Sequence, residues 1–407
     1  MISICGYLYD YRGFLGNGCV NINDQGTIDS ISKLPKMEKV YKFEKYIIGP
    51  GLVDLHVHLR GLDLSYKEDE ETGTKSALKS GITLVVDMPN TKPRLDNYSA
   101  IKSKLNSLKE KSYTDYGVYS AIPKNTKDME EVLKLPIAGF KIYPEDIGNR
   151  KDMIKEVLKL NRFTIVHPEL PEAEKIHDEE NLLRGILRGC HLEGAAVDVI
   201  HKFNENAKVH ITHASCPSTV LEAKKFGYTV DTTPHHLFYN SKNQGCYYRV
   251  NPPLREEYIR ENLMKLFIDG NIDALCSDHA PHSKKEKENF KTCPSGIPWL
   301  GSWPWLIFRL VKYDLIKISN FFYYISYSPS KILGLNNYGS LEKGKRGNII
   351  TIDKDKVWRF IETYSKAPYY NHFMEENYGF VTNAFIGGEL VLDNDNIIKG
   401  KNIINPF

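Results

Sequence analysis

Short apolar runs alternate with longer stretches of mixed polarity through the middle of the chain. The runs are rich in β-branched residues and most end in polar residues, which indicates short strands. Their repetition, rather than any single run, carries the prediction. The eight predicted strands lie within residues 51–60, 81–90, 116–121, 137–143, 162–168, 209–213, 228–236 and 272–282.

Helix-like stretches separate these runs. Eight strands that alternate with helices are typical of a (β/α)8 barrel, an α/β fold of the TIM type. One such barrel takes roughly 250 residues, so the pattern predicts a barrel over residues 50–340. Its active site would lie at the carboxyl ends of the strands. The helix-like stretches include residues 66–80, 127–135, 193–206, 218–226 and 256–268.

The two ends of the chain look alike and differ from the middle. Residues 1–49 and 341–407 both contain short strand-like pieces, and turn signals such as Asn17-Gly18 and Gln25-Gly26 lie between those of the first segment. The simplest account is one small β-domain, similar to a β-sandwich, that both termini build beside the barrel.

The most informative run is Gly51-Leu-Val-Asp-Leu-His-Val-His-Leu-Arg60. In a strand, residues i and i+2 point to the same face, so His56 and His58 can hold one metal ion. The guanidinium of Arg60, two residues later, can bind a carboxylate at two points. A single His-x-His is weak evidence, because a histidine in a barrel strand can also be a core residue.

Polar side chains also end or follow the later runs. Zinc binds imidazole nitrogen and carboxylate oxygen, and a catalytic zinc site leaves one position open to water. Together these residues predict a metal-containing active site, although a structural role stays open for each one alone. They are Asn90, Lys141, His167, His213, Asp278, His279 and His282.

Charge and composition exclude several classes of partner. The chain has 54 Lys and Arg residues against 51 Asp and Glu residues, a net charge of +3, so neither nucleic acid nor a membrane surface is the expected partner. The seven cysteines are odd in number and form no Cys-x-x-Cys, so we expect neither a disulfide framework nor a thiolate zinc site. We expect a cytoplasmic protein without a secretion signal or a membrane span.

Eight motifs occur in order along nearly the whole chain. Together they resemble those of the dihydroorotases of the cyclic amidohydrolase superfamily, metal-dependent enzymes that open or close cyclic amides. The motifs are His56-Val-His-Leu-Arg60, Asp87-Met-Pro-Asn-Thr91, Gly139-Phe-Lys-Ile-Tyr-Pro144, His167-Pro168, His210-Ile-Thr-His-Ala-Ser215, Thr233-Pro-His-His-Leu237, Asn251-Pro-Pro-Leu-Arg255 and Ser277-Asp-His-Ala-Pro-His282.

This resemblance implies a site with two Zn²⁺ ions bridged by a carboxylated lysine, Lys141. A lysine desolvated among cations can lose its proton, and the neutral amine can then take up CO2. The metals would lower the pKa of a shared water to form a bound hydroxide, and Asp278 would act as general acid and base. The implied ligands are His56, His58, Lys141, His167, His213 and Asp278.

The resemblance also implies a reaction, the reversible interconversion of dihydroorotate and N-carbamoyl-L-aspartate in pyrimidine biosynthesis. Arg60, Asn90 and His282 would bind the substrate carboxylate, and Asn251 would contact the ring. Allantoinases and hydantoinases resemble one another in lacking the arginine and the last histidine, so Arg60 and His282 argue against those activities. An inactive scaffold partner of another pyrimidine-pathway enzyme would be favoured only if the protein bound no metal.

The association state and two segments stay open at this stage. We expect a homodimer or an association with another enzyme of the pathway. After Gly296-Ile-Pro298 the family continues Gly-Leu-Glu-Thr, whereas this chain has Trp299-Leu-Gly-Ser-Trp303, which puts the packing of that loop in doubt. The lysine-rich residues 283–291 are predicted to form a mobile, solvated loop that could act as a lid.

Overall fold

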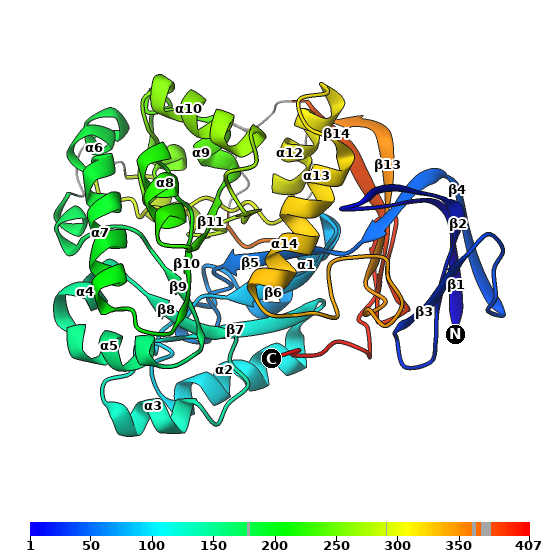
Figure 1. Cartoon of the computed structure of the whole chain (residues 1–407), viewed down its shortest axis with the longest axis horizontal. Helices are drawn as coiled ribbons and strands as arrows, with labels where there is room; N and C mark the ends of the chain where they lie inside the picture. Colours follow the sequence, from blue (N-terminus) through cyan, green and yellow to red (C-terminus); the bar gives the residue numbers. More distant parts are fainter. Residues whose placement is uncertain (177–179, 290, 360–363, 368–375) are drawn as a thin grey trace.

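The middle of the chain forms the barrel. A computed structural model describes residues 1–176, 180–289, 291–359, 364–367 and 376–407. Eight parallel strands follow one another in sequence order, each hydrogen-bonded to the next, which confirms the predicted (β/α)8 barrel (Figure 1). They are β5 (Leu52–Val57), β6 (Ile82–Asp87), β7 (Asp115–Ala121), β8 (Gly139–Ile142), β9 (Phe163–Val166), β10 (Lys208–Ile211), β11 (Thr229–Thr232) and β12 (Ala274–Leu275).

The barrel closes between its last strand and its first. Val57 at the end of β5 pairs in parallel with His279, and the amide of His58 donates to the carbonyl of His279 at 2.8 Å. All residues of β5 to β9 are buried, as expected for strands that are covered on both sides. Closure brings the carboxyl ends of all the strands to one end of the barrel.

Helices cover the outside of the barrel (Figure 1). Each helix-like stretch of the sequence contains a helix, although α1 begins only at Glu70, where the capping box of Asp69 and Thr72 starts it. The helices are α1 (Glu70–Lys79), α2 (Tyr98–Lys111), α3 (Thr126–Val132), α4 (Pro144–Asn149), α5 (Lys151–Lys159), α6 (Asn181–Leu187), α7 (Cys190–Phe203), α8 (Pro217–Lys225), α9 (Pro234–Phe238), α10 (Glu257–Ile268), α11 (Lys284–Lys287), α12 (Trp303–Lys312), α13 (Ile318–Phe322) and α14 (Ser328–Ile332).

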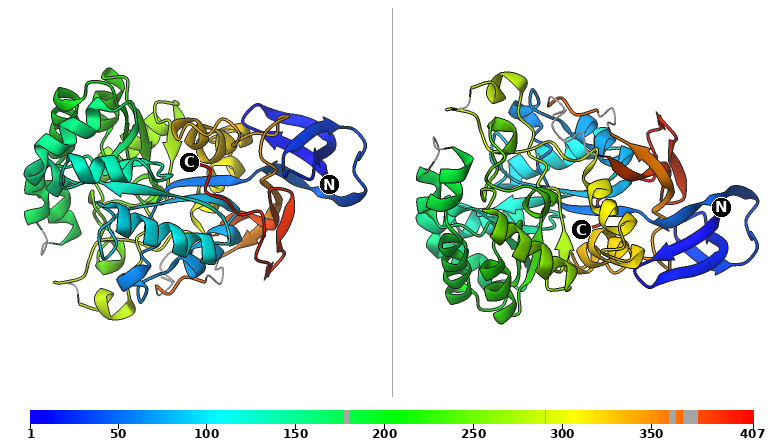
Figure 2. Two further views of the ribbon diagram at one scale, coloured as in Figure 1. Left: turned by 90° about the horizontal axis from the view of Figure 1, so that it is seen from below. Right: turned by 90° about the horizontal axis from the view of Figure 1, so that it is seen from above.

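A second, mixed sheet lies beside the barrel and is built from both ends of the chain, as predicted (Figure 2). Strand β4 pairs in parallel with β1 and antiparallel with β13, and so joins the two terminal segments. The domain limits at residues 50 and 340 stay a prediction. The strands are β1 (Ile2–Asp10), β2 (Gly13–Ile22), β3 (Ile28–Ser32), β4 (Lys39–Pro50), β13 (Ile349–Trp358), β14 (Asn377–Ile386), β15 (Glu389–Asp393) and β16 (Asn396–Ile397).

One of the two turns predicted near the amino terminus, at Asn17-Gly18, is wrong. Asn17 and Gly18 lie inside β2, where they pair with Tyr7 and Gly6 of β1, so pairing with a neighbouring strand overrides the local turn preference. The chain instead turns before β2, next to Gly13, which has φ 106°. The second signal is correct, since Gly26 lies in the turn between β2 and β3 with φ 73°.

The altered loop after Pro298 is part of the core. Trp299 is 2% exposed, and Trp303 at the start of α12 is fully buried. The Trp299 indole Nε1 donates to Nδ1 of His235 at 3.1 Å and the two rings stack. The tryptophans therefore belong to the main hydrophobic core.

The expectation of no disulfides is wrong. Cys5 pairs with Cys19, Cys190 with Cys216 and Cys246 with Cys293, and Cys276 is a buried free thiol. The pairs are separated by 14, 26 and 47 residues, so sequence spacing gave no sign that the fold brings their sulfur atoms together. The cysteines therefore do not support the expected cytoplasmic location.

Among the described residues, no helix is long and apolar enough to cross a membrane. The cytoplasmic location stays a prediction.

The lysine-rich segment, which the structure describes apart from residue 290, is largely exposed as expected, but it contains a short helix and one buried lysine. Ser283 caps the short helix α11, and Lys287 at the end of that helix is buried. Its ammonium donates to the carbonyls of Cys246 and Pro294 at 2.9 and 2.6 Å. Lys287 thereby links α11 to Cys246, which lies between α9 and α10, and to Pro294 in the loop before α12.

Candidate active site

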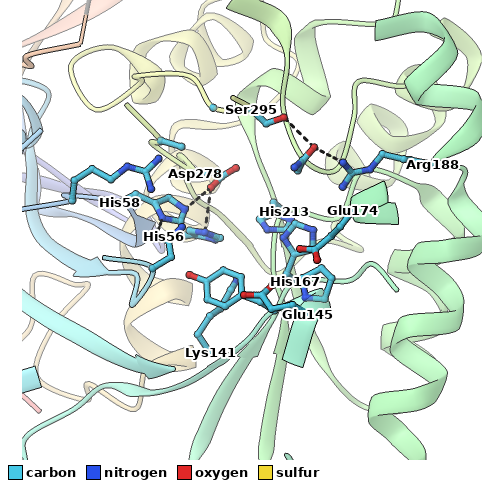
Figure 3. A pocket seen from close by; sticks show the side chains of 17 residues that line it. His56, His58, Lys141, Glu145, His167, Glu174, Arg188, His213, Asp278 and Ser295 are labelled. Carbon is cyan, nitrogen blue, oxygen red and sulfur yellow. Dashed lines mark hydrogen bonds and ion pairs between the residues drawn. The ribbon is translucent and has the colours of Figure 1, made fainter. Parts of the chain in front are cut away.

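A cavity of about 240 Å³ lies at the carboxyl ends of the barrel strands (Figure 3). It brings together predicted residues that are far apart in the sequence. Two residues of the predicted strand ends, His279 and His282, do not line it. The predicted residues that line the cavity are His56, His58, Arg60, Asn90, Lys141, His167, His213, Asn251 and Asp278.

His56, His58 and Asp278 form the tightest cluster in this cavity. One potential ligand atom from each lies within 4.8 Å of the others. Oδ1 of Asp278 is 3.2 Å from Nε2 of His56 and 3.2 Å from Nε2 of His58. Asp278 has φ 46°, in the left-handed region, where the chain turns as it leaves β12. The three side chains therefore converge on one point, as a metal site requires.

Hydrogen bonds set the proton positions on His56 and His58. The Thr212 hydroxyl lies 3.1 Å from a carboxylate oxygen of Asp231, to which it donates, and it accepts from Nδ1 of His56 at 2.7 Å. The side-chain oxygen of Asn90 accepts from Nδ1 of His58 at 2.6 Å. In both rings Nε2 is left without the proton of the neutral form, so it can bind a metal.

His167 and His213 lie next to each other, with ring centroids 4.5 Å apart. Nε2 of His167 is 2.7 Å from a carboxylate oxygen of Glu169, so this nitrogen carries a proton and Nδ1 is left free. His213 is buried with φ 41°, and its amide donates to Asp231 at 2.5 Å. Its Nδ1 has no hydrogen-bond partner among the described residues. This pair offers a second group of imidazole ligands.

Lys141 lies in β8 beneath these rings and is fully buried. Its ammonium nitrogen has no hydrogen-bond partner in the described part of the chain. Burial lowers the pKa of Lys141 to about 8, although the charge of Asp278 opposes this shift. The neutral amine is therefore accessible near neutral pH.

The donor set fits a divalent metal. Burial lowers the pKa of His56, His58 and His213, which keeps these rings neutral and able to coordinate. The carboxylate of Asp278 and the unpartnered amine of Lys141 face the same cavity. Buried polar atoms without partners are rare in proteins, and a bound metal ion would explain why Lys141 and His213 have such atoms.

Arg60 forms the wall of the cavity beside the cluster. It is 6% exposed, and its backbone has φ 56°. The fully buried Lys104 ammonium donates to the Arg60 carbonyl at 3.0 Å and holds this turn in place. No carboxylate of the described residues lies within 4.0 Å of the Arg60 guanidinium. The Arg60 side chain is thus a buried cation without a paired anion, and a bound anion would stabilise it.

His282 lies behind Arg60. Its Nε2 is 3.3 Å from Nη2 of Arg60 and 3.0 Å from the carbonyl of Ser295, and its Nδ1 is 3.3 Å from the ammonium of Lys67. Burial and the neighbouring cations hold the pKa of His282 well below its ordinary value. In this structure His282 contacts Arg60, whereas the resemblance placed His282 on the substrate itself.

Sequence reasoning missed the groups that hold the ligands. Asp231 in β11 accepts from the side chain of Thr212, and it also lies 2.7 Å from Nε2 of His210. Glu169 follows His167 by two residues, and that spacing was the available signal. Burial raises the pKa of Glu169, but Arg188 and His167 outweigh it, so the pKa lies well below the usual range.

Two further missed residues, Glu145 and Glu174, line the cavity (Figure 3). Burial, followed by the charge of Glu145, raises the pKa of Glu174 to about 7. Arg94 pairs with Glu145 at 3.0 Å. The carboxyl groups of Glu145 and Glu174 make the cavity wall near His167 acidic, whereas the wall formed by Arg60 is basic.

Comparison with known proteins agrees with this geometry. The amidohydrolase family matches residues 47–391. The dihydroorotase of Aeropyrum pernix is 42% identical over 334 residues, which are 79% of this chain and 77% of that protein. The dihydroorotase of Sulfolobus acidocaldarius is 37% identical over 404 residues, 97% of both chains.

Solved structures show the same fold. The L-hydantoinase of Arthrobacter aurescens has a TM-score of 0.89 at 18% identity, and it covers 99% of this chain and 98% of its own. A D-hydantoinase has a TM-score of 0.87 at 21% identity, with 99% and 97% covered. At such identities the likeness concerns the fold alone, and the sequence relatives decide the family. The chain belongs to the amidohydrolase family and, within it, to the dihydroorotases.

Proposed function

We propose that this chain interconverts dihydroorotate and N-carbamoyl-L-aspartate. The observation that carries the proposal is the buried Arg60 guanidinium, which faces the cavity without a carboxylate partner among the described residues, beside His58 and Asp278. A substrate carboxylate would supply the missing charge while the adjacent amide bond lies near the metal-binding cluster.

A direct assay in both directions, with zinc or cobalt supplied, tests the activity. We expect ring opening at alkaline pH and ring closure at acidic pH, because closure consumes a proton. No turnover in either direction by folded, metal-loaded protein would contradict the proposal.

We propose two Zn²⁺ ions per subunit as the cofactor. Bound zinc would activate a water molecule and polarise the substrate carbonyl. The proposal is supported by the proton positions on the histidine rings and by the buried amine among them. Metal analysis of the purified protein tests it, and a protein that bound no metal would favour the scaffold role. The proposed ligands are His56, His58, Lys141, His167, His213 and Asp278.

Lys141 is proposed to carry a carboxyl group. The neutral amine would form a bond to the carbon of CO2 and release a proton, and the resulting carbamate would present two oxygens to the ligand cluster. We predict that Lys141→Ala loses bound metal and nearly all activity, with partial rescue by short carboxylic acids. The exposed Lys127 provides the control variant Lys127→Ala. Full metal content and rate in Lys141→Ala would make Lys141 a structural lysine.

Asp278 is proposed to move the proton. It would take the proton from the attacking water and pass it to the leaving ring nitrogen. Asp278→Ala should abolish kcat while the protein still binds dihydroorotate, which isothermal titration would show. Undiminished kcat would assign the proton transfer to another group.

Arg60 is proposed to read the carboxylate. Hydrogen bonds to charged groups are worth about 1.5 to 3 kcal/mol, so Arg60→Met should lower kcat/KM by roughly 10- to 150-fold and leave metal content unchanged. Arg359 is exposed, and Arg359→Met serves as the matched control. If Arg60→Met left dihydroorotate kinetics unchanged but altered turnover of hydantoin or allantoin, the substrate assignment would be wrong.

We propose that the chain forms a homodimer through α6. This short helix buries polar residues and exposes apolar ones, the reverse of an ordinary surface helix. A second copy is the simplest occupant, because closed homo-oligomers are the commonest assemblies. Asn181 and Arg184 are each 2% exposed, whereas Leu182, Leu183, Ile186 and Leu187 are 43%, 41%, 55% and 43% exposed.

Light scattering on the purified protein tests this interface. Ile186→Ser should shift a dimer toward monomer, whereas Leu315→Ser, at an exposed site outside α6, should not. A wild-type protein that is monomeric at micromolar concentration would contradict the homodimer and leave α6 to a different enzyme.

A further inference from the structure

Arg188 follows α6 and is 1% exposed, yet it contacts both sides of the candidate active site. Its Nε donates to Oε1 of Glu169 at 2.9 Å, and its Nη2 donates to Oε2 of Glu169 at 2.5 Å. Its Nη1 donates to Oδ1 of Asn251 at 2.8 Å. One guanidinium therefore holds a carboxylate at two points and an amide at a third.

The Glu169 contact leads to a proposed metal ligand. Oε2 of Glu169, which Arg188 holds, is also 2.7 Å from Nε2 of His167. A carboxylate fixed in this way keeps a proton on Nε2 of His167 and presents Nδ1 to the cavity. Without Arg188, Glu169 would be a buried charge paired only with the imidazole, and its position would no longer be defined by two bonds.

The Asn251 contact leads to the substrate side. Oδ1 of Asn251 accepts from Nη1 of Arg188, from Nη2 of Arg184 at 2.6 Å and from the Ser295 hydroxyl at 3.1 Å. Three donors occupy this oxygen, so the amide group cannot flip without placing its NH2 against two guanidinium groups. The group that Asn251 can offer to the cavity is consequently Nδ2, a donor.

We propose that Arg188 is a positioning residue that sets two functions at once. Through Glu169 it fixes the ring nitrogen with which His167 binds metal, and through Asn251 it fixes an N–H donor that reads a carbonyl oxygen of the cyclic substrate. This rests on the proposed dihydroorotase function for the identity of the ring, but the metal-binding half stands without it.

The geometry requires arginine rather than a positive charge alone. A lysine ammonium at this position is a single point and cannot make two parallel bonds to Glu169 while a third nitrogen reaches Asn251. Arg188→Lys therefore keeps the charge and removes the arrangement. Arg184 supplies the matched control, because it contacts Asn251 and Ser295 but makes no contact with Glu169.

The experiment measures zinc affinity by chelator competition and steady-state kinetics in the same variants. Arg188→Lys should weaken zinc binding by about 10- to 100-fold and raise KM for dihydroorotate by about tenfold. Arg184→Lys should raise KM to a similar extent and leave zinc affinity within about twofold of wild type. Asn251→Asp, which replaces the N–H donor by an acceptor, should raise KM at unchanged zinc affinity.

Each outcome decides a separate point. Zinc affinity within about twofold of wild type in Arg188→Lys, or an equal loss in Arg184→Lys, would overturn the positioning role. Unchanged KM in Asn251→Asp would overturn the donor assignment. If Arg188→Lys failed to fold, Glu169→Gln would test the metal-binding half, with the same expected loss of zinc affinity. A wild-type protein that bound zinc but turned over no dihydroorotate would instead refute the proposed function.

Discussion

Two threonine hydroxyls form hydrogen bonds with histidine rings inside the barrel. One of these rings lines the cavity and the other does not. Thr212 contacts Nδ1 of His56, which faces the cavity, and Thr229 contacts Nδ1 of His210 at 2.8 Å, which does not line it. At the scale of single residues, a histidine that could bind metal is therefore distinguished by whether its other ring nitrogen, Nε2, faces the cavity. The first nitrogen is satisfied by the protein in both cases.

We predict that Thr212→Val weakens zinc binding by about 10- to 100-fold, because valine cannot accept the Nδ1 proton of His56. Thr229→Val should leave zinc affinity unchanged, since His210 is bound to Asp231 and lies outside the cavity. Chelator competition on the two purified variants measures both affinities. Equal affinities in Thr212→Val and wild type would show that His56 is oriented by packing alone.

At the scale of elements, α11 makes stability depend on pH. Burial, followed by the charges of Arg249 and Arg184, lowers the pKa of Lys287 to about 7. In the unfolded chain this pKa is about 10.4. Between these pH values the unfolded chain binds a proton that the folded protein does not bind, so the free energy of unfolding contributed by Lys287 rises with pH.

We predict that wild type gains stability relative to Lys287→Met between pH 7 and pH 10, by an amount on the order of a few kcal/mol. Below pH 7 the difference between the two proteins should stay constant, because Lys287 is then protonated in both states. Urea unfolding at several pH values measures it. Lys284→Met, at an exposed position of the same helix, should show the same change of the free energy of unfolding with pH as wild type. If Lys287→Met also showed the wild-type pH dependence, the prediction would be contradicted.

At the scale of the whole molecule, Asp115 connects the barrel to the segment before β13 and to the carboxyl-terminal segment. This fully buried carboxylate at the start of β7 accepts from Nε of Arg346 at 2.7 Å, from the Tyr338 hydroxyl at 2.9 Å and from Nδ2 of Asn348 at 2.8 Å. It also accepts from the amide of Ile404 at 2.9 Å. The barrel, the second sheet and the carboxyl-terminal segment thus meet at one side chain.

We predict that Asp115→Asn lowers the free energy of unfolding by about 3 to 5 kcal/mol, because it replaces the fully buried carboxylate that is the counter-ion of the half-buried Arg346. Asp152 is exposed in α5, and Asp152→Asn should change stability by less than about 1 kcal/mol. Denaturant unfolding of both variants checks the difference. A change below about 1 kcal/mol in Asp115→Asn would mean that packing alone joins the two parts.

Much of the barrel and the grouping of the candidate ligands could be predicted because both depend on short-range patterns. The two-residue repeat of a strand places His56 and His58 on one face, whatever the rest of the chain does. Most of the predicted strand runs end in polar residues or are followed by them, and all parallel strands end on the same side, so Lys141, His213 and Asp278 could be grouped from the sequence alone. The motifs then indicated the family.

Only the tertiary structure decided which atoms meet. The bond between Thr212 and His56 joins residues 156 positions apart, and that between Arg188 and Asn251 joins residues 63 apart. Contacts between residues far apart in the sequence also form the disulfides, bury Lys287 and place His282 behind Arg60. Such contacts depend on how the barrel closes and how its loops pack, and neither residue type nor local periodicity encodes these distances. The sequence determined which chemistry the strand ends carry, and closure of the barrel determined which nitrogen, oxygen and proton face the cavity.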